Sequence, residues 1–174
     1  GATSVFNGTG INAGQFDVTE TIANLIMTGG TFNASSNAIW TITGSGNFTG
    51  GAGNTLFVGN SGTRLSFGSL NLTDMTATAG GTVGTSNSFT LYGNSGTQVS
   101  TITVGPGSLT LNNSRFNLRR GGAGALGSRL IVNGGVATAG TAATFISEDA
   151  AGGVNGIAVV ELSSTAGAAT RSLN

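Results

Sequence analysis

The hexapeptide Gly68-Ser-Leu-Asn-Leu-Thr73 returns later in the chain as Gly107-Ser-Leu-Thr-Leu-Asn112, and this repetition is the strongest guide to the fold. A second motif, Phe57-Val-Gly-Asn-Ser-Gly-Thr63, returns at a shorter offset as Leu91-Tyr-Gly-Asn-Ser-Gly-Thr97. Repeats with unequal offsets are typical of solenoids, in which short units stack and the corners accept insertions. The repeats therefore predict an all-β solenoid of stacked strands.

Apolar residues around these motifs alternate with Thr, Ser and Asn in short bursts, as in Ile39-Trp-Thr-Ile42 and Ile102-Thr-Val104. Such alternation is typical of strands with one buried face, and the Gly-rich segments between bursts suit tight corners. Trp40 lies in one burst and is predicted to be a core residue. The only helical candidate is the segment 17–27. A β-sandwich of the Greek-key or jelly-roll kind also consists of short alternating strands and stays open as the alternative.

Charge is scarce in this chain of 174 residues, because charged residues make up 7 % of it against roughly 25 % in an ordinary domain. Six Arg balance six acidic residues at a net charge of zero, and Cys, His and Lys are absent. A neutral chain lacks the attraction that drives binding to nucleic acid or anionic lipid, so neither is an expected partner. No apolar run approaches the roughly 20 residues of a membrane-spanning helix, so no membrane span is expected.

The chain resembles the autotransporter-associated β-strand repeats of large bacterial surface and secreted proteins in the segments Gly93-Asn-Ser-Gly-Thr97, Gly107-Ser-Leu-Thr-Leu-Asn-Asn113 and Arg129-Leu-Ile-Val-Asn-Gly-Gly135. This resemblance implies a right-handed parallel β-helix that is exported and does structural or adhesive work. We expect a β-solenoid over residues 51–174, and a cap or irregular rungs over residues 1–50, within one continuous domain. Because the chain starts at Gly1 without Met, we expect a processed product or a fragment of a longer protein.

Candidate catalytic groups are few, because a chain without His, Cys or Lys lacks the usual bases and nucleophiles. Two pairs of acids remain, Asp17 with Glu20 and Glu148 with Asp149. Adjacent residues of a strand point to opposite faces, so the second pair cannot converge, and the first would converge only on a helix. The Gly-rich segment 121–126 has Leu126 where a calcium-binding repeat needs Asp. We therefore expect no enzyme activity, no metal and no cofactor.

Four of the six Arg residues lie close together in the sequence: Arg115, Arg119, Arg120 and Arg129. Arg forms bidentate pairs with carboxylates, so we expect these residues to form an interface. Their expected partners are Glu148, Asp149 or Glu161 of the same or a neighbouring copy. Solvated loop residues and a contact with glycan are the alternatives.

Five Asn-x-Ser/Thr sequons are candidate N-glycosylation sites if the source has that pathway: Asn7, Asn33, Asn47, Asn71 and Asn112. Asn and Thr are frequent throughout the chain, so chance accounts for most of these matches. Glycosylation therefore stays a secondary expectation.

The features above predict an extracellular or cell-surface structural protein, a self-associating subunit of a bacterial surface fibre or layer. The strand edges at the ends of a solenoid pair with other chains when nothing covers them, so copies of the same chain are the expected partners. The segment 4–6 or the segment 171–173 is predicted to pair with a neighbouring copy. The alternative is a carbohydrate-binding or adhesive module, in which Thr, Asn and Arg side chains contact polysaccharide.

Overall fold

The structure, a computed structural model, describes residues 5–7, 19–34, 36–50, 55–59, 62–76, 87–93, 95–120, 125–133, 137–139, 144–149 and 158–163. In these ranges it is all-β, and it contains no helix that could span a membrane. Fifteen strands are present: β1 (Val5–Asn7), β2 (Thr19–Ile22), β3 (Asn24–Met27), β4 (Gly30–Ala34), β5 (Ile39–Thr49), β6 (Thr55–Gly59), β7 (Arg64–Thr73), β8 (Ser88–Gly93), β9 (Ser100–Val104), β10 (Leu109–Asn112), β11 (Arg115–Arg120), β12 (Ser128–Asn133), β13 (Ala137–Ala139), β14 (Thr144–Asp149) and β15 (Ala158–Ser163).

The segment 17–27, the one helical candidate, is not a helix in the part that the structure describes. Residues 19–27 form β2 and β3 instead, and burial alternates with period two along both strands. Thr side chains at every second position favour a strand, because β-branched side chains lose rotamer freedom in a helix. The break between the two strands falls at Ala23.

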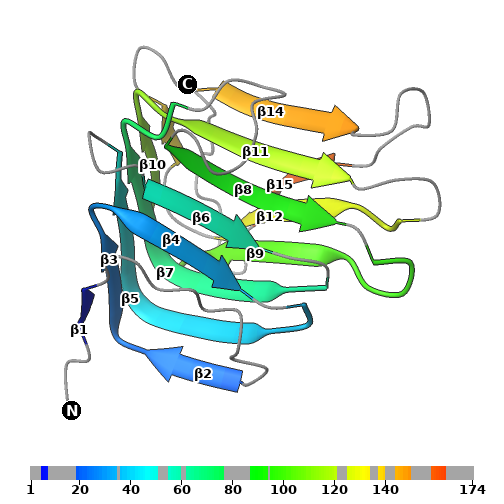
Figure 1. Cartoon of the computed structure of the whole chain (residues 1–174), viewed down its shortest axis with the longest axis horizontal. Helices are drawn as coiled ribbons and strands as arrows, with labels where there is room; N and C mark the ends of the chain where they lie inside the picture. Colours follow the sequence, from blue (N-terminus) through cyan, green and yellow to red (C-terminus); the bar gives the residue numbers. More distant parts are fainter. Residues whose placement is uncertain are drawn as a thin grey trace.

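The strands form two sheets with parallel pairing (Figure 1). Within the described residues sheet A has ten strands, with β1-β3-β5-β7-β9-β12-β15 as its main path, and sheet B has five in the order β4-β6-β8-β11-β14. All thirteen strand pairs described are parallel. This pairing contradicts the Greek-key or jelly-roll sandwich, whose neighbouring strands are antiparallel.

Sheet A is bent, and its long strands β5 and β7 run through the bend. The two ends of β5 therefore pair with different strands. Residues 39–42 of β5 pair with β2, and residues 46–48 pair with β3. The register between β5 and β7 shifts between Ile42 and Ser45, and such irregularities bend a sheet. We call β2, the starts of β5 and β7, β9, β12 and β15 the first limb, and β1, β3, the ends of β5 and β7, β10 and β13 the second limb. Figure 1 shows both limbs and sheet B around one interior.

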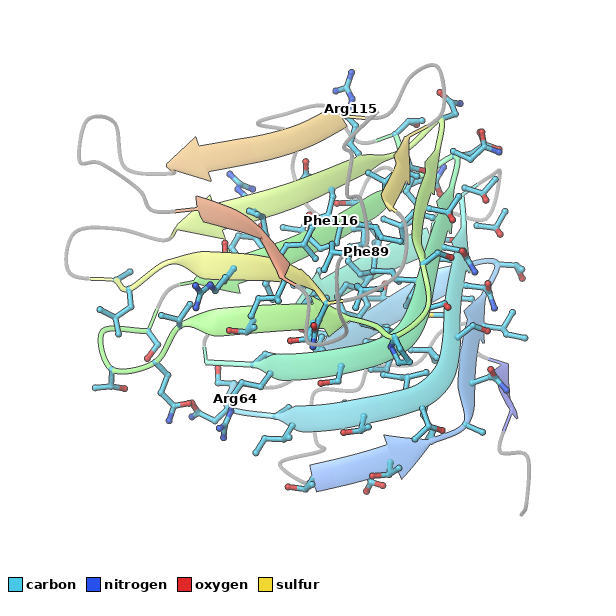
Figure 2. The ribbon with its side chains drawn as sticks, turned by 180° about the vertical axis from the view of Figure 1, so that it is seen from behind. Arg64, Phe89, Arg115 and Phe116 are labelled. Carbon is cyan, nitrogen blue, oxygen red and sulfur yellow. The ribbon has the colours of Figure 1, made fainter. Side chains whose placement is uncertain are left out.

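A column of phenylalanines runs along the core side of sheet B. Phe32, Phe57, Phe89 and Phe116 are paired in register on neighbouring strands, and the backbone register continues to Phe145. The rings of Phe57 and Phe89 stack with their centroids 4.2 Å apart. Phe89 and Phe116 lie side by side in the interior (Figure 2). Aromatic pairs contribute about 0.5–1.5 kcal/mol beyond the burial of their area, so this column stabilises the pairing of the strands.

The first limb buries a second column, formed by Trp40, Leu65, Ile102 and Leu130. Trp40 is only 5 % exposed, which confirms it as a core residue. Its ring also meets Phe32 of sheet B edge to face, with the centroids 5.1 Å apart. Side chains from both sheets therefore pack into a single core.

The two copies of the hexapeptide pair with each other. Leu70 of the first copy lies opposite Leu109 of the second, and Leu72 lies opposite Leu111. All four side chains are at most 1 % exposed. The repeated Leu-x-Leu pattern therefore fills the same two core positions on neighbouring strands.

The second repeat is not paired at the offset of its two copies in the sequence. Phe57 pairs with Phe89 and not with Leu91, its counterpart in the repeated motif. The slip from Leu91 to Phe89 is one full side-chain period of a strand, so the apolar residues keep facing the core. The stacking of Phe57 on Phe89 accompanies this register.

The described part of the segment 1–50 contributes strands to the same two sheets as the rest of the chain, since β4 pairs with β6 and β5 pairs with β7. A division at residue 50 stays a prediction. Val5 of β1 pairs with Asn24 of the same chain, although the segment 4–6 was one of two segments predicted to pair with a neighbouring copy. The other, the segment 171–173, lies outside the described residues.

Candidate functional site

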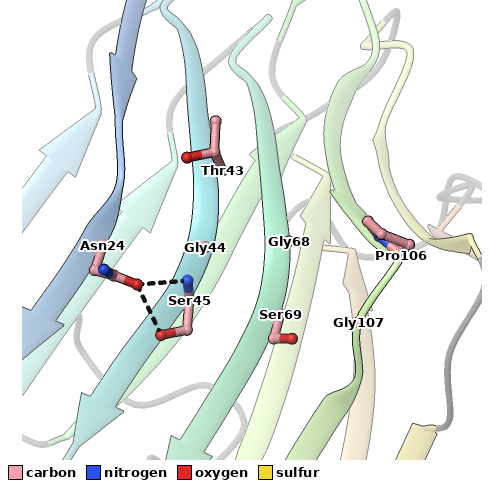
Figure 3. A pocket seen from close by; sticks show the side chains of 8 residues that line it. All are labelled: Asn24, Thr43, Gly44, Ser45, Gly68, Ser69, Pro106 and Gly107. Atoms are coloured by element: carbon pink, nitrogen blue, oxygen red, sulfur yellow. Dashed lines mark hydrogen bonds between the residues drawn. The ribbon is translucent and has the colours of Figure 1, made fainter. Parts of the chain in front are cut away.

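An open groove of about 380 Å³ lies at the bend of sheet A. Figure 3 shows that its lining comes from neighbouring segments, namely β3, β5, β7 and the connection between β9 and β10. Eight residues line it: Asn24, Thr43, Gly44, Ser45, Gly68, Ser69, Pro106 and Gly107. The bend thus gathers residues that are far apart in the sequence.

Glycines allow the strands to approach one another closely at this bend. A Cβ atom on Gly44 would lie 2.6 Å from Asn24 Oδ1 and 2.7 Å from the carbonyl oxygen of Ala23. A Cβ atom on Gly68 would meet the carbonyl oxygens of Thr43 and Gly44, the latter at 2.5 Å. These distances are too short for any side chain, so the groove depends on the missing Cβ atoms.

Hydrogen bonds between neighbouring strands fix the polar lining of the groove. Ser45 donates to Asn24 Oδ1 from its backbone nitrogen at 2.9 Å and from its hydroxyl at 3.1 Å (Figure 3). The backbone nitrogen of Ser108 donates to Ser69 Oγ at 3.2 Å. The lining residues are all uncharged, and several of their hydroxyl and amide groups take part in the hydrogen bonds between the strands.

The four Arg residues of the predicted interface separate onto two sheets. Arg129 lies on β12 of sheet A, in one column with Thr101 and Arg64. Glu161, one of the predicted partners, pairs with Ile131, two positions along from Arg129. The other three lie on β11 of sheet B: Arg115, Arg119 and Arg120. Arg64 and Arg115 lie well apart at the periphery (Figure 2), and the role of the Arg residues as an interface stays a prediction.

Arg119 contacts Tyr92 on the neighbouring strand. Its Nη1 donates to the Tyr92 hydroxyl at 3.1 Å, and its guanidinium carbon lies 5.3 Å from the centroid of the ring. This geometry combines a hydrogen bond with a cation–π contact. The register also pairs Arg119 with Glu148 and Arg120 with Asp149. The pairing of these Arg residues with acidic side chains stays a prediction.

The acids considered for catalysis are not brought together within the described residues. Asp17 lies outside them, whereas Glu20 lies on β2 and pairs with Trp40. Glu148 and Asp149 are consecutive positions of β14. In the described part of the chain no group of three or more His, Cys, Asp or Glu residues could hold a metal ion. Of the segment 121–126, considered for calcium, only Ala125 and Leu126 are described.

Two of the candidate glycosylation sites are stacked on the second limb. Asn71 Nδ2 donates to Asn47 Oδ1 at 2.8 Å, and Asn47 Nδ2 donates to Ser45 Oγ at 3.0 Å. The nitrogen atoms that would carry a glycan are therefore engaged in hydrogen bonds, and both side chains are half-buried. The other sequons differ in exposure: Asn33 is half-buried, Asn112 is exposed, and Asn7 lies on β1.

The groove and the role of Tyr92 were not predicted from the sequence, although Gly68, Ser69 and Gly107 belong to the repeated hexapeptide. Gly-Ser recurs at residues 44–45, 68–69 and 107–108, and this recurrence is the signal that could have indicated the groove. Its significance depends on the bend, which no local pattern encodes. Compared with family models, curated proteins and solved structures, the chain has no match.

Proposed function

We propose that the chain is a right-handed parallel β-helix that works as an extracellular structural protein, whose copies associate into a bacterial surface fibre or layer. The observation that carries the proposal is the continuous parallel stacking of strands in shared columns. In the first limb these columns run from β2 through β5, β7, β9 and β12 to β15. Such a stack repeats at about 4.8 Å and is the geometry of a rod segment.

The surface of the first limb supports association between copies. Thr41, Ser66 and Thr103 occupy one outward column in register. With a net charge of zero, the chain has little electrostatic repulsion to keep copies apart. The resemblance to bacterial surface repeats favours the extracellular location.

The ends of the stack supply a means of association. The described strands of sheet B end at β4 and β14, and each end strand is paired on one side within the described part of the chain. A strand edge presents backbone donors and acceptors that a strand of a second chain can pair with. Head-to-tail stacking would continue the columns from one copy into the next.

We expect electron microscopy of the purified chain at rising concentration to show filaments, and their diffraction to show an axial reflection near about 4.8 Å. Strands perpendicular to the filament axis produce this reflection. Isolated globular particles at every concentration would overturn the proposal of self-association.

The groove at the bend favours a second candidate function, binding of a neutral polysaccharide. Its lining offers hydroxyl, amide and backbone groups without charge, which match the hydroxyl groups of sugars. On a glycan array the chain should then bind selected neutral glycans. Thr43→Arg should weaken that binding about tenfold or more by filling the groove, a loss of about 1.4 kcal/mol. Ser66→Arg, which changes an exposed residue outside the lining, is the matched control and should leave binding unchanged.

A further inference from the structure

A charged residue occupies a core-facing position at the N-terminal end of the first limb. Along β2, Thr19 and Thr21 are exposed, whereas Glu20 and Ile22 are half-buried. Ile22 packs against the core, which places Glu20 on the same side of the strand. The column that begins at Glu20 continues through buried apolar side chains: Trp40, Leu65, Ile102 and Leu130.

The same column ends on an apolar residue at the other end of the limb. Val160 of β15 pairs with Leu130, and Leu162 pairs with Val132. Among the described strands, β2 pairs with β5 alone and β15 pairs with β12 alone. A second copy that continued the columns would therefore bring Val160 of its β15 next to Glu20.

We infer that Glu20 controls the self-association proposed above, by opposing the addition of a second copy to the β2 edge. Pairing of β15 with β2 would transfer the carboxylate from water to a position between Trp40 and the Val160 of that second copy. Burial of a carboxylate without a partner costs free energy, and the described side chains of this column below Glu20 are apolar. An inward-pointing charge is one of the ways in which proteins protect sheet edges from pairing. The inference rests on the proposed self-association and concerns the protein concentration at which assembly begins.

Two substitutions remove the charge in different ways. Glu20→Gln keeps the size of the side chain, and Glu20→Val also makes the column apolar from end to end. Thr21→Val is the control, since it adds the same apolar, β-branched side chain one position along on the exposed face of the strand. Far-UV circular dichroism and unfolding curves of each variant verify that it folds.

The measurement is the lowest protein concentration at which assemblies appear in analytical ultracentrifugation and electron microscopy. Glu20→Val should lower it at least about tenfold, which is 1.4 kcal/mol of association free energy, and Glu20→Gln should lower it in the same direction. Thr21→Val should leave it within about twofold of the unsubstituted chain, as expected of an exposed site.

The outcomes separate the two proposals. Equal thresholds for the unsubstituted chain and both Glu20 variants would overturn the role of Glu20 and leave self-association standing. A threshold lowered as much by Thr21→Val would also overturn it, because added apolar surface would then explain the change. Absence of assemblies from every variant at every concentration would overturn self-association and the role of Glu20 together.

Discussion

Replacement of Phe89 by Ala is expected to lower the free energy of unfolding by about 3–5 kcal/mol. Phe89 is fully buried, and its ring centroid lies 4.2 Å from that of Phe57 and 4.9 Å from that of Phe116. Ala would remove both ring contacts and leave a cavity, because the paired strands on either side hold the neighbouring rings in place. Urea unfolding followed by circular dichroism measures the loss.

Phe89→Leu is the matched control for the ring. It keeps an apolar side chain of moderate size, so the expected loss is below about 3 kcal/mol and smaller than that of the Ala variant. Equal losses for the two variants would show that the ring contacts, and not the volume that Leu retains, account for the effect. A loss below about 1 kcal/mol for Phe89→Ala would contradict the stacked column, since ordinary surface substitutions stay within about 0.5 kcal/mol.

Replacement of Gly68 by Ala is expected to destabilise the chain by about 3 kcal/mol, although it adds a single methyl group. The new Cβ would meet the carbonyl oxygens of Thr43 and Gly44 on the neighbouring strand β5, the latter at 2.5 Å. Backbone atoms cannot rotate away as a flexible side chain can, so the strands at the bend must separate. The same unfolding experiment measures this effect.

Gly96→Ala is the control for the general effect of Gly→Ala. Gly96 is exposed and is not among the positive-φ glycines. At such a site Ala stabilises by about 0.4–1 kcal/mol, because it restricts the unfolded chain. A stabilising effect of Gly68→Ala as well would contradict the close approach of strands at the bend.

Strands and core side chains were predictable from the sequence because their signal is local. Alternation in bursts such as 39–42 and 102–104 predicted strands with one buried face, and both segments lie in strands of sheet A. Trp40 was assigned to the core on the same pattern and is buried. Parallel pairing itself is not local, and its prediction rested on the two repeats and on the resemblance to bacterial surface repeats.

Two local patterns in the sequence do not correspond directly to the strands of the structure. The spacing of Asp17 and Glu20 suited a helix, but alternation of exposed Thr with half-buried residues shows a strand at 19–22. In the repeated Gly-Asn-Ser-Gly-Thr sequence at 59–63 and 93–97, the described residues 62–63 and 95–97 lie beyond the ends of β6 and β8. The distance between the two copies in the sequence therefore does not give the pairing of the strands, which follows the register of Phe57 with Phe89.

The candidate site was less predictable than the fold. The groove exists because a bend brings Asn24, Ser45 and Ser69 together, and the recurrence of Gly-Ser does not by itself show that these residues meet at a bend. For the Arg residues, in contrast, the fold separates what the sequence places together. They are neighbours in the sequence, yet β11 and β12 place Arg119 and Arg129 in different sheets.

Parallel pairing also determines the order in which the chain can fold. No two consecutive strands among those described pair with each other, and the partners lie as far apart as Leu70 and Leu109. Each contact therefore requires a loop to close first, which makes the earliest pairing slow. Once two strands are paired, every later strand adds to an existing edge, and growth proceeds by neighbour contacts. We therefore expect a long lag before the first strands pair and rapid completion afterwards.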